Sequence, residues 1–200
     1  MTMLEQRIQQ QFFESADLKY QSAEVLSRPV ADAAQAIVAG LTAGGRLFVA
    51  GLGVASSLAQ MLASEMLGRF ERERPGLAAI ALGSDGAMLS ALGTEGHVGL
   101  LLARQVDTLG QPGDLLLLID AETEHPGLLA AAQAAQGKDM TVIALTARTG
   151  GALRAVLGET DVVVAVPHER RARVLEAQLL VLHCLCDAID LQLLGEQDPA

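Results

Sequence analysis

Aromatic residues are scarce in this sequence. It has no tryptophan, one tyrosine and four phenylalanines among 200 residues, although 50% of its residues are hydrophobic. The excess of alanine and leucine over aromatic side chains favours helices that pack closely. So much apolar surface on a chain of this length fits one globular domain, and it also indicates burial between subunits. We therefore expect a single domain that forms an oligomer.

Positively charged residues are also few. Lys and Arg number 14 and Asp and Glu 24, which leaves a net charge of −10. Binding to nucleic acid or to an anionic membrane surface needs clustered positive charge, so neither partner is expected. The one dense basic group, Arg170, Arg171 and Arg173 beside Glu169, is interpreted as a solvated helix start.

Cysteine is limited to Cys184 and Cys186. Two positions apart on a predicted helix, their side chains point in different directions, which argues against a disulfide between them. Both are expected to be buried thiols. The first residues lack the apolar stretch of a signal peptide, and no run of about 18 apolar residues could span a membrane. A cytoplasmic location is the expectation.

Helical and strand-like segments alternate along the chain. Apolar spacing predicts a helix over residues 4–26, a second from Arg28-Pro29 through Leu41, and a long last helix over residues 170–194. Five short apolar runs lie between them, at residues 47–50, 77–82, 115–119, 141–145 and 162–166. This order predicts an α/β fold in which helices cover both faces of a parallel sheet.

Two loops follow predicted strands and are candidates for a ligand cleft. The first contains Gly51 and Gly53 and leads to Ser56 and Ser57, either of which can cap the next helix. This loop lacks the third glycine of the dinucleotide fingerprint and the lysine of a P-loop. The loop is therefore only weak evidence for a nucleotide site, and a tight turn is the favoured interpretation.

The second loop carries Asp120, Glu122 and Glu124, together with Thr123 and His125, which is interpreted as a helix start before proline. Ligands of open α/β sheets bind beyond the carboxyl ends of the strands, where helix N-termini favour anions. A carboxylate about 4 Å from a phosphate interacts by roughly 4 kcal/mol at an effective dielectric of about 20, more than a helix end contributes. The loop is either a barrier to anionic ligands or an ordinary solvated loop.

Motifs in this order resemble those of the sugar isomerase (SIS) domain family, in its phosphoheptose isomerase branch. They are the Gly51-Leu-Gly53 loop and the segments at residues 63–70, 73–82, 103–106, 113–115, 139–146, 150–151, 173–176 and 184–190. Within the branch, the segments at residues 69–75 and 184–187 are most similar to the DiaA group, whose members associate with the bacterial replication initiator DnaA.

The resemblance covers nearly the whole chain and implies its organisation. It implies a single SIS domain, with a five-stranded parallel sheet flanked by helices in a flavodoxin-like three-layer sandwich. Residues 44–200 are assigned to this domain, and residues 1–43 to N-terminal helices that pack on it and take part in oligomerisation. It also implies a tetramer whose ligand clefts lie between subunits.

Phosphoheptose isomerases interconvert sedoheptulose 7-phosphate and a heptose 7-phosphate, and the resemblance places their proton-transferring Glu and His at Glu65 and His183. Isomerases that hold a metal add a His and a Gln, where this chain has Met61 and Leu175. Two remaining ligands make a poor zinc site, so neither a metal nor another cofactor is expected. The alternative for His183 is a core or interface position, with Glu65 of another subunit as its partner.

The residues that bind phosphate in the family also depart from its pattern. The first loop of the family, Gly-Asn-Gly-Gly/Thr-Ser, has become aliphatic at residues 51–55. The second, Ser-Thr-x-Gly-Asn-Ser, has become acidic at residues 120–125, and Thr123 alone keeps a hydroxyl. We therefore expect a SIS scaffold that has lost sugar-phosphate binding and isomerase activity.

The expected function is that of a DiaA-like adaptor rather than an enzyme: a homotetramer that presents several copies of one surface to DnaA and promotes its assembly at the replication origin. Leu193 and Leu194 are the expected contact with DnaA, and interface core is their other interpretation. Tetramer formation is attributed to apolar residues on the first and last helices, namely Leu4, Ile8, Phe12, Leu182, Leu185 and Ile189. The alternative functions are a phosphoheptose isomerase acting through Glu65 and His183, and a sensor whose cleft binds a neutral or cationic ligand.

Overall fold

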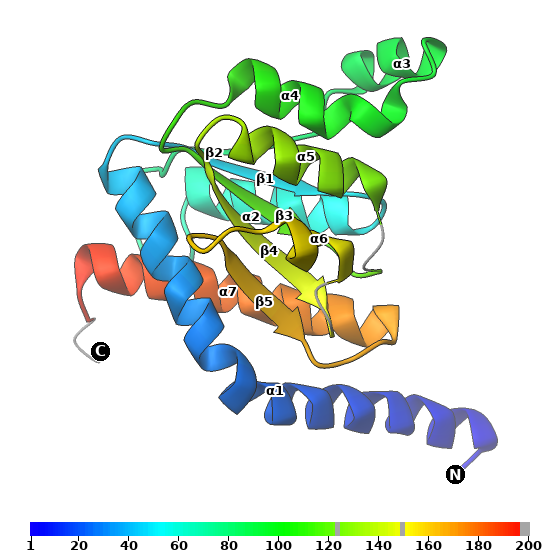
Figure 1. Cartoon of the computed structure of the whole chain (residues 1–200). Coiled ribbons are helices and arrows are strands. Elements are labelled where there is room, and N and C mark those ends of the chain that lie inside the picture. Colours follow the sequence, from blue (N-terminus) through cyan, green and yellow to red (C-terminus); the bar gives the residue numbers. More distant parts are fainter. Residues whose placement is uncertain (123–124, 149–150, 197–200) are drawn as a thin grey trace.

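Five parallel strands form one sheet in the order β2-β1-β3-β4-β5 (Figure 1). The computed structural model describes residues 1–122, 125–148 and 151–196. The strands are β1 (Leu47–Gly51), β2 (Ala79–Ala81), β3 (Leu115–Ile119), β4 (Thr141–Ala147) and β5 (Val162–Val166). The predicted α/β fold with a five-stranded parallel sheet is confirmed. Within the described residues, no helix is long and apolar enough to cross a membrane.

Helices cover both faces of the sheet (Figure 1). One face carries α1 (Met3–Thr42), α2 (Ala55–Leu67) and α7 (Arg171–Leu194). The other carries α4 (Leu101–Leu109), α5 (Pro126–Gln136) and α6 (Gly151–Val156), with α3 (Gly86–Thr94) and the short 3-10 helix η1 (Val98–Leu100) beside α4.

The central strand β3 shows why the strands are continuous apolar runs. Leu115, Leu117 and Ile119 pack on the side of α1, α2 and α7, whereas Leu116 and Leu118 pack on the side of α4, α5 and α6. A strand that is buried on both faces has no solvent side, so it carries no alternating polar residues. The edge strand β2 is shorter than the predicted run at residues 77–82, because only three of its residues pair with β1.

A single helix of 40 residues, α1, stands where the sequence predicted two helices. Pro29 lies inside it. A proline removes one backbone hydrogen bond, but the helix continues where tertiary packing holds it on both sides of the break. Leu26 and Val30 supply that packing, because both are buried in the core. The helix changes direction along its length, and its N-terminal part projects from the body as an arm (Figure 1).

The arm exposes apolar side chains. Leu4, Ile8 and Phe12 are 66%, 50% and 72% exposed, as a role between subunits requires. The residues of α7 that were predicted to share this role, Leu182, Leu185 and Ile189, are instead buried in the core of the same chain. That part of the prediction is wrong, because α7 lies on the sheet and buries its apolar face there.

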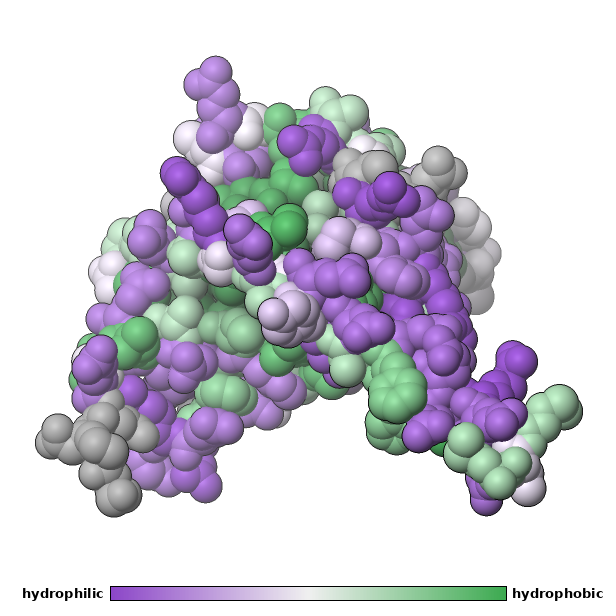
Figure 2. Space-filling model, turned by 90° about the horizontal axis from the view of Figure 1, so that it is seen from below, coloured by the Kyte–Doolittle hydropathy of each residue, from purple (hydrophilic) through white to green (hydrophobic). Residues whose placement is uncertain are grey.

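An apolar groove of about 360 Å³ lies between α1 and α7. Leu26, Val30 and Ala31 line it from α1, and Leu180 and Val181 from α7. Seen from below, hydrophobic residues show between hydrophilic ones on the side of the molecule from which the arm projects (Figure 2). The single chain therefore leaves apolar surface uncovered on this side.

Candidate functional site

The order of the strands locates a cleft. In a parallel sheet of order 2-1-3-4-5, ligands bind beyond the carboxyl ends of β1 and β3, where the strand order reverses. A cavity of about 240 Å³ lies between the loops that follow these two strands. Its lining residues are Leu52, Gly53, Ala55, Ala121, Glu122, His125, Arg171 and Leu175. The structure thus brings the two predicted ligand loops together, and we call this cavity the switch-point cleft.

Two glycines shape the first loop of the cleft. A Cβ atom at Gly51 would lie 2.5 Å from a backbone oxygen of α2, and Gly53 has a φ angle of +58°. The chain can therefore turn tightly into α2 only with glycine at these positions. The predicted cap is absent: the Ser56 hydroxyl donates to the carbonyl oxygen of Gly53 at 2.7 Å, and the N-cap residue Val54 makes no side-chain hydrogen bond. Ser57 is exposed.

The second loop does not present all its acidic residues to the cleft. Asp120 is buried, and its carboxylate accepts a hydrogen bond from the backbone N–H of Glu122 at 3.0 Å. The buried side-chain amide of Gln178 donates to the carbonyl oxygen of Asp120 at 3.0 Å, which anchors the loop to α7. Thr123 and Glu124 lie outside the described residues. Asp120 therefore shapes the loop from a buried position.

An arginine faces the cleft. Arg171, the first residue of α7, binds Glu122 with 2.8 Å between Nε and Oε1. His125, which precedes α5 as predicted, has its Nε2 atom 3.6 Å from the Oε2 atom of Glu122. Interpreting Arg171 as part of a solvated helix start missed this positive group. Its place after β5 was the available signal, because the carboxyl ends of parallel strands share one edge of the sheet.

Glu65 and His183 lie where α2 meets α7. The ring of Phe70, just after α2, stacks on the imidazole of His183 with 5.7 Å between the ring centroids. Glu65 is close enough to Cys186, three residues along α7 from His183, for its charge to raise the pKa of that thiol. Both Glu65 and His183 are half-buried. A carboxylate and an imidazole are therefore held near the same stretch of α7, where a ligand can still reach them.

A buried arginine holds these two helices together. Arg74 pairs with Asp190 of α7 at 2.5 Å, and the two side chains are only 1% and 2% exposed. Its other nitrogens donate to the carbonyl oxygens of Glu65 at 2.9 Å and of Met66 at 2.8 Å, in the last turn of α2. This contact complements the negative end of the helix dipole, and it fixes Glu65 relative to His183. The sequence did not predict a role for Arg74, because it lies in a run of charged residues at positions 71–74, a pattern that is typical of exposed segments.

The two cysteines are both free thiols, but the expectation that both are buried is wrong for Cys184. Cys186 is buried and Cys184 is exposed. Burial, reinforced by the carboxylates of Glu65 and Asp190, raises the pKa of Cys186 to about 12. Cys186 is therefore a protonated packing residue beside Glu65.

Comparison with known proteins identifies the family. The family model described as SIS domain matches residues 11–147. A phosphoheptose isomerase of Methylibium petroleiphilum is 58% identical over 99% of both chains, and one of Thiobacillus denitrificans is 43% identical over 98% of this chain and 99% of its own. The solved structure of a phosphoheptose isomerase from Francisella tularensis has a TM-score of 0.90 at 38% identity, and the match covers 95% of this chain and 99% of that one. This chain belongs to the SIS domain family.

These relatives overturn the prediction that this SIS protein is a DnaA-binding adaptor for replication initiation. They are phosphoheptose isomerases by name, match nearly the whole chain, and do not show the expected closeness to DiaA. The expectation that the chain is not an enzyme is likewise unsupported. The prediction had relied on the loss of hydroxyl donors from two loops, and it had left out Arg171, which lines the same cleft from another element.

The metal centre of metal-holding isomerases does not fit this SIS chain. Met61 and Leu175, at the positions of the missing ligands, are half-buried and offer only a thioether and an aliphatic group. Glu65 and His183 remain as two ligands where catalytic zinc takes three. Among the described residues, no group of three or more His, Cys, Asp and Glu side chains is placed to hold a metal ion.

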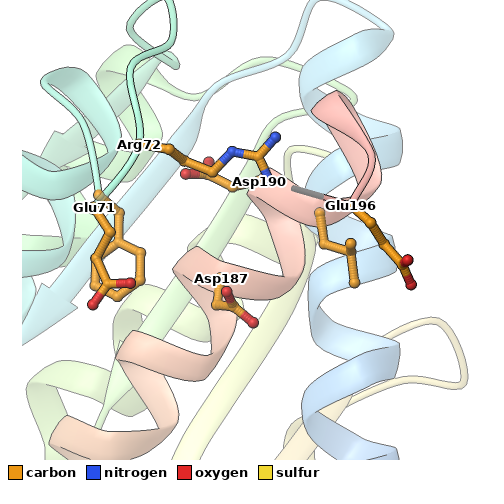
Figure 3. A pocket seen from close by; sticks show the side chains of 7 residues that line it. Glu71, Arg72, Asp187, Asp190 and Glu196 are labelled. Atoms are coloured by element: carbon orange, nitrogen blue, oxygen red, sulfur yellow. The ribbon is translucent and has the colours of Figure 1, made fainter. Parts of the chain in front are cut away.

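An acidic cavity of about 300 Å³ lies beside Phe70. Figure 3 shows that three carboxylates lining it, those of Glu71, Asp187 and Glu196, point in different directions. Arg72 reaches across the end of α7, where its guanidinium donates to the carbonyl oxygen of Gly195 at 3.0 Å. These carboxylates are separate surface groups and do not form a shared ligand site.

Proposed function

We propose that this protein is a phosphoheptose isomerase that interconverts sedoheptulose 7-phosphate and an aldose heptose 7-phosphate. The observation that carries the proposal is the identity of 58%, over 99% of the chain, with a protein of that name. The placement of Glu65 and His183 supports it, because an aldose–ketose isomerisation needs two groups that exchange protons with the substrate.

In the proposed reaction, Glu65 is the base and His183 moves the hydroxyl proton. The Glu65 carboxylate removes a proton from C1 of the ketose, and the electron pair of that C–H bond forms the C1–C2 double bond of an enediol. Glu65, now protonated, then donates a proton to C2, while His183 carries a proton from the oxygen on C1 to the oxygen on C2. Carbon, oxygen and hydrogen balance, and the product is the aldose. Such general acid–base steps contribute about 10²–10⁴-fold each.

The distance between this pair and the switch-point cleft supports a site made by two copies of the chain. At a helical rise of 1.5 Å per residue, about 15 Å along α2 separates Ala55 from Glu65, and about 18 Å along α7 separates Arg171 from His183. A heptose phosphate is shorter than either distance. We therefore propose that the cleft of one copy meets Glu65 and His183 of another in a homotetramer.

A coupled assay of sedoheptulose 7-phosphate conversion tests the function. We expect turnover by the wild-type protein, and a loss of about 10²–10⁴-fold in kcat for Glu65→Gln and for His183→Asn. Glu71→Gln is the matched control, because it removes a nearby exposed carboxylate that has no proposed role. Absence of turnover by a folded, oligomeric wild-type protein would contradict the proposal, as would Glu65→Gln with wild-type kcat.

A further inference from the structure

Two cavities meet at one ion pair. The switch-point cleft of about 240 Å³ and a neighbouring cavity of about 380 Å³ share Ala121, Glu122 and Arg171 in their walls. Arg148 and His168 also line the second cavity. The contact between Glu122 and Arg171 therefore belongs to the walls of both cavities, and we call it the partition.

The groups around this partition are suited to binding an anion when Glu122 does not occupy Arg171. Arg171 and Arg148 bring two guanidinium groups to adjoining walls, and each is matched by one carboxylate, at 2.8 Å from Glu122 and 2.9 Å from Glu169. His168 accepts the backbone N–H of Arg170 at Nδ1, so its Nε2 is left as the nitrogen that can donate. The positive charges are thus present but neutralised by the chain itself.

We propose that the Glu122 carboxylate is a resident substitute for the phosphate group of the substrate. It occupies Arg171 while the cleft is empty, and the phosphate displaces it on binding. The identity of the ligand as a sugar phosphate rests on the proposed function, whereas the displacement rests on the geometry of the pair. When Glu122 moves out to solvent, the partition opens and the two cavities become one site.

The exposure of the pair makes this exchange feasible. The side chains of Glu122 and Arg171 are 45% and 49% exposed, and ion pairs with that access to water are held weakly. A phosphomonoester carries close to two negative charges and several acceptor oxygens, so it binds a guanidinium with two parallel hydrogen bonds and outcompetes one carboxylate. Glu122 also repels anions that bind Arg171 less strongly. The pair therefore favours phosphate esters over singly charged carboxylates.

Titration calorimetry with inorganic phosphate tests the displacement without any turnover. We expect Glu122→Gln to bind phosphate about two- to fivefold more tightly than the wild-type protein, because it frees Arg171 from a weak exposed pair. Arg171→Gln should weaken binding about tenfold or more, since it removes the charged donor. Glu159→Gln is the matched control, because it makes the same charge change in an exposed residue before β5, at the opposite edge of the sheet, and should leave affinity unchanged.

The double variant Glu122→Gln with Arg171→Gln separates displacement from a general charge effect. It should bind phosphate more weakly than the wild-type protein if Arg171 is the phosphate ligand. Wild-type affinity in the double variant would overturn the proposal, because cancelled charges would then explain both single variants. Equal or weaker binding by Glu122→Gln, or no phosphate binding by any variant, would overturn it as well.

The same variants distinguish this proposal from the proposed function. With sedoheptulose 7-phosphate as substrate, Glu122→Gln should lower KM and Arg171→Gln should raise it, both with kcat nearly unchanged. Turnover with a KM that neither substitution changes would support the isomerase function and contradict the displacement of Glu122 by phosphate. If the wild-type protein shows no turnover and Glu122→Gln still binds phosphate more tightly, the displacement is supported and the isomerase function is contradicted.

Discussion

At the cleft, Glu122 cancels the charge of Arg171, while Asp120 is occupied by the backbone of its own loop. Adding formal charges along residues 120–125 therefore overstates how strongly the loop repels an anion. The charge that a ligand meets depends on which side chains are paired, and the partner of Glu122 lies on a different element. No single loop contains this information, so the sequence alone could not show which charges at the cleft are paired.

Buried Cys186 predicts a loss of stability at alkaline pH. Its pKa is about 12 in the native state against an ordinary value of 9.0, so the unfolded chain releases the thiol proton first as the pH rises. Unfolding is thereby favoured between these two values, by about 1.4 kcal/mol per pH unit for one fully shifted group, and stability below pH 9 is unaffected. Urea unfolding from pH 8 to 11 should show a shallower decline for Cys186→Ala than for the wild-type protein; parallel declines would refute this assignment.

Among the elements, the buried strands were predictable and the N-terminal region was not. The apolar runs at residues 115–119 and 162–166 match β3 and β5 residue for residue. For β3 the reason is that a strand covered on both faces leaves a continuous hydrophobic signal. The break predicted at Pro29 relied on local preference alone. Packing of α1 against α7 and β5 overrides it, and packing of distant segments is not visible in local sequence.

Two leucines at the end of α7, which the sequence predicted as one contact surface, differ in burial. Leu193 is half-buried against the core, whereas Leu194 is 43% exposed. We expect Leu193→Ala to lower the free energy of unfolding by about 1–2 kcal/mol, below the 2–5 kcal/mol range for fully buried leucine, and Leu194→Ala to change it by about 0.5 kcal/mol or less. Urea midpoints measure both. Equal losses for the two variants would show that the helix end packs differently.

At the scale of the whole molecule, two features lead us to expect an oligomer: the uncovered apolar surface, and the separation of the switch-point cleft from Glu65 and His183. The arm of α1 and the groove between α1 and α7 leave hydrophobic residues exposed on one chain. Within that chain the cleft lies about 15 Å along α2 from Glu65 and about 18 Å along α7 from His183. An oligomer would answer both, by covering the surface and completing the site.

Mixed oligomers test whether two chains share a site. Co-expression of Glu65→Gln chains with Arg171→Gln chains should restore activity at limiting substrate to about a quarter of the wild-type value, because random pairing leaves about one site in four with both native residues. Each variant alone should remain poorly active, and light scattering should show the same oligomer throughout. Mixed oligomers no more active than the two parents would place the whole site within one chain.

The central claim is that Glu65 moves a carbon-bound proton of a sugar phosphate, and isomerisation in D₂O observed by proton NMR tests it most directly. During conversion of sedoheptulose 7-phosphate by the wild-type protein, the proton held on Glu65 can exchange with solvent, so deuterium should enter the substrate and product at C1 and C2. The Glu65→Gln variant, folded and oligomeric, should show neither conversion nor exchange. Conversion and exchange at the wild-type rate in that variant, or neither in the wild-type protein, would contradict the claim.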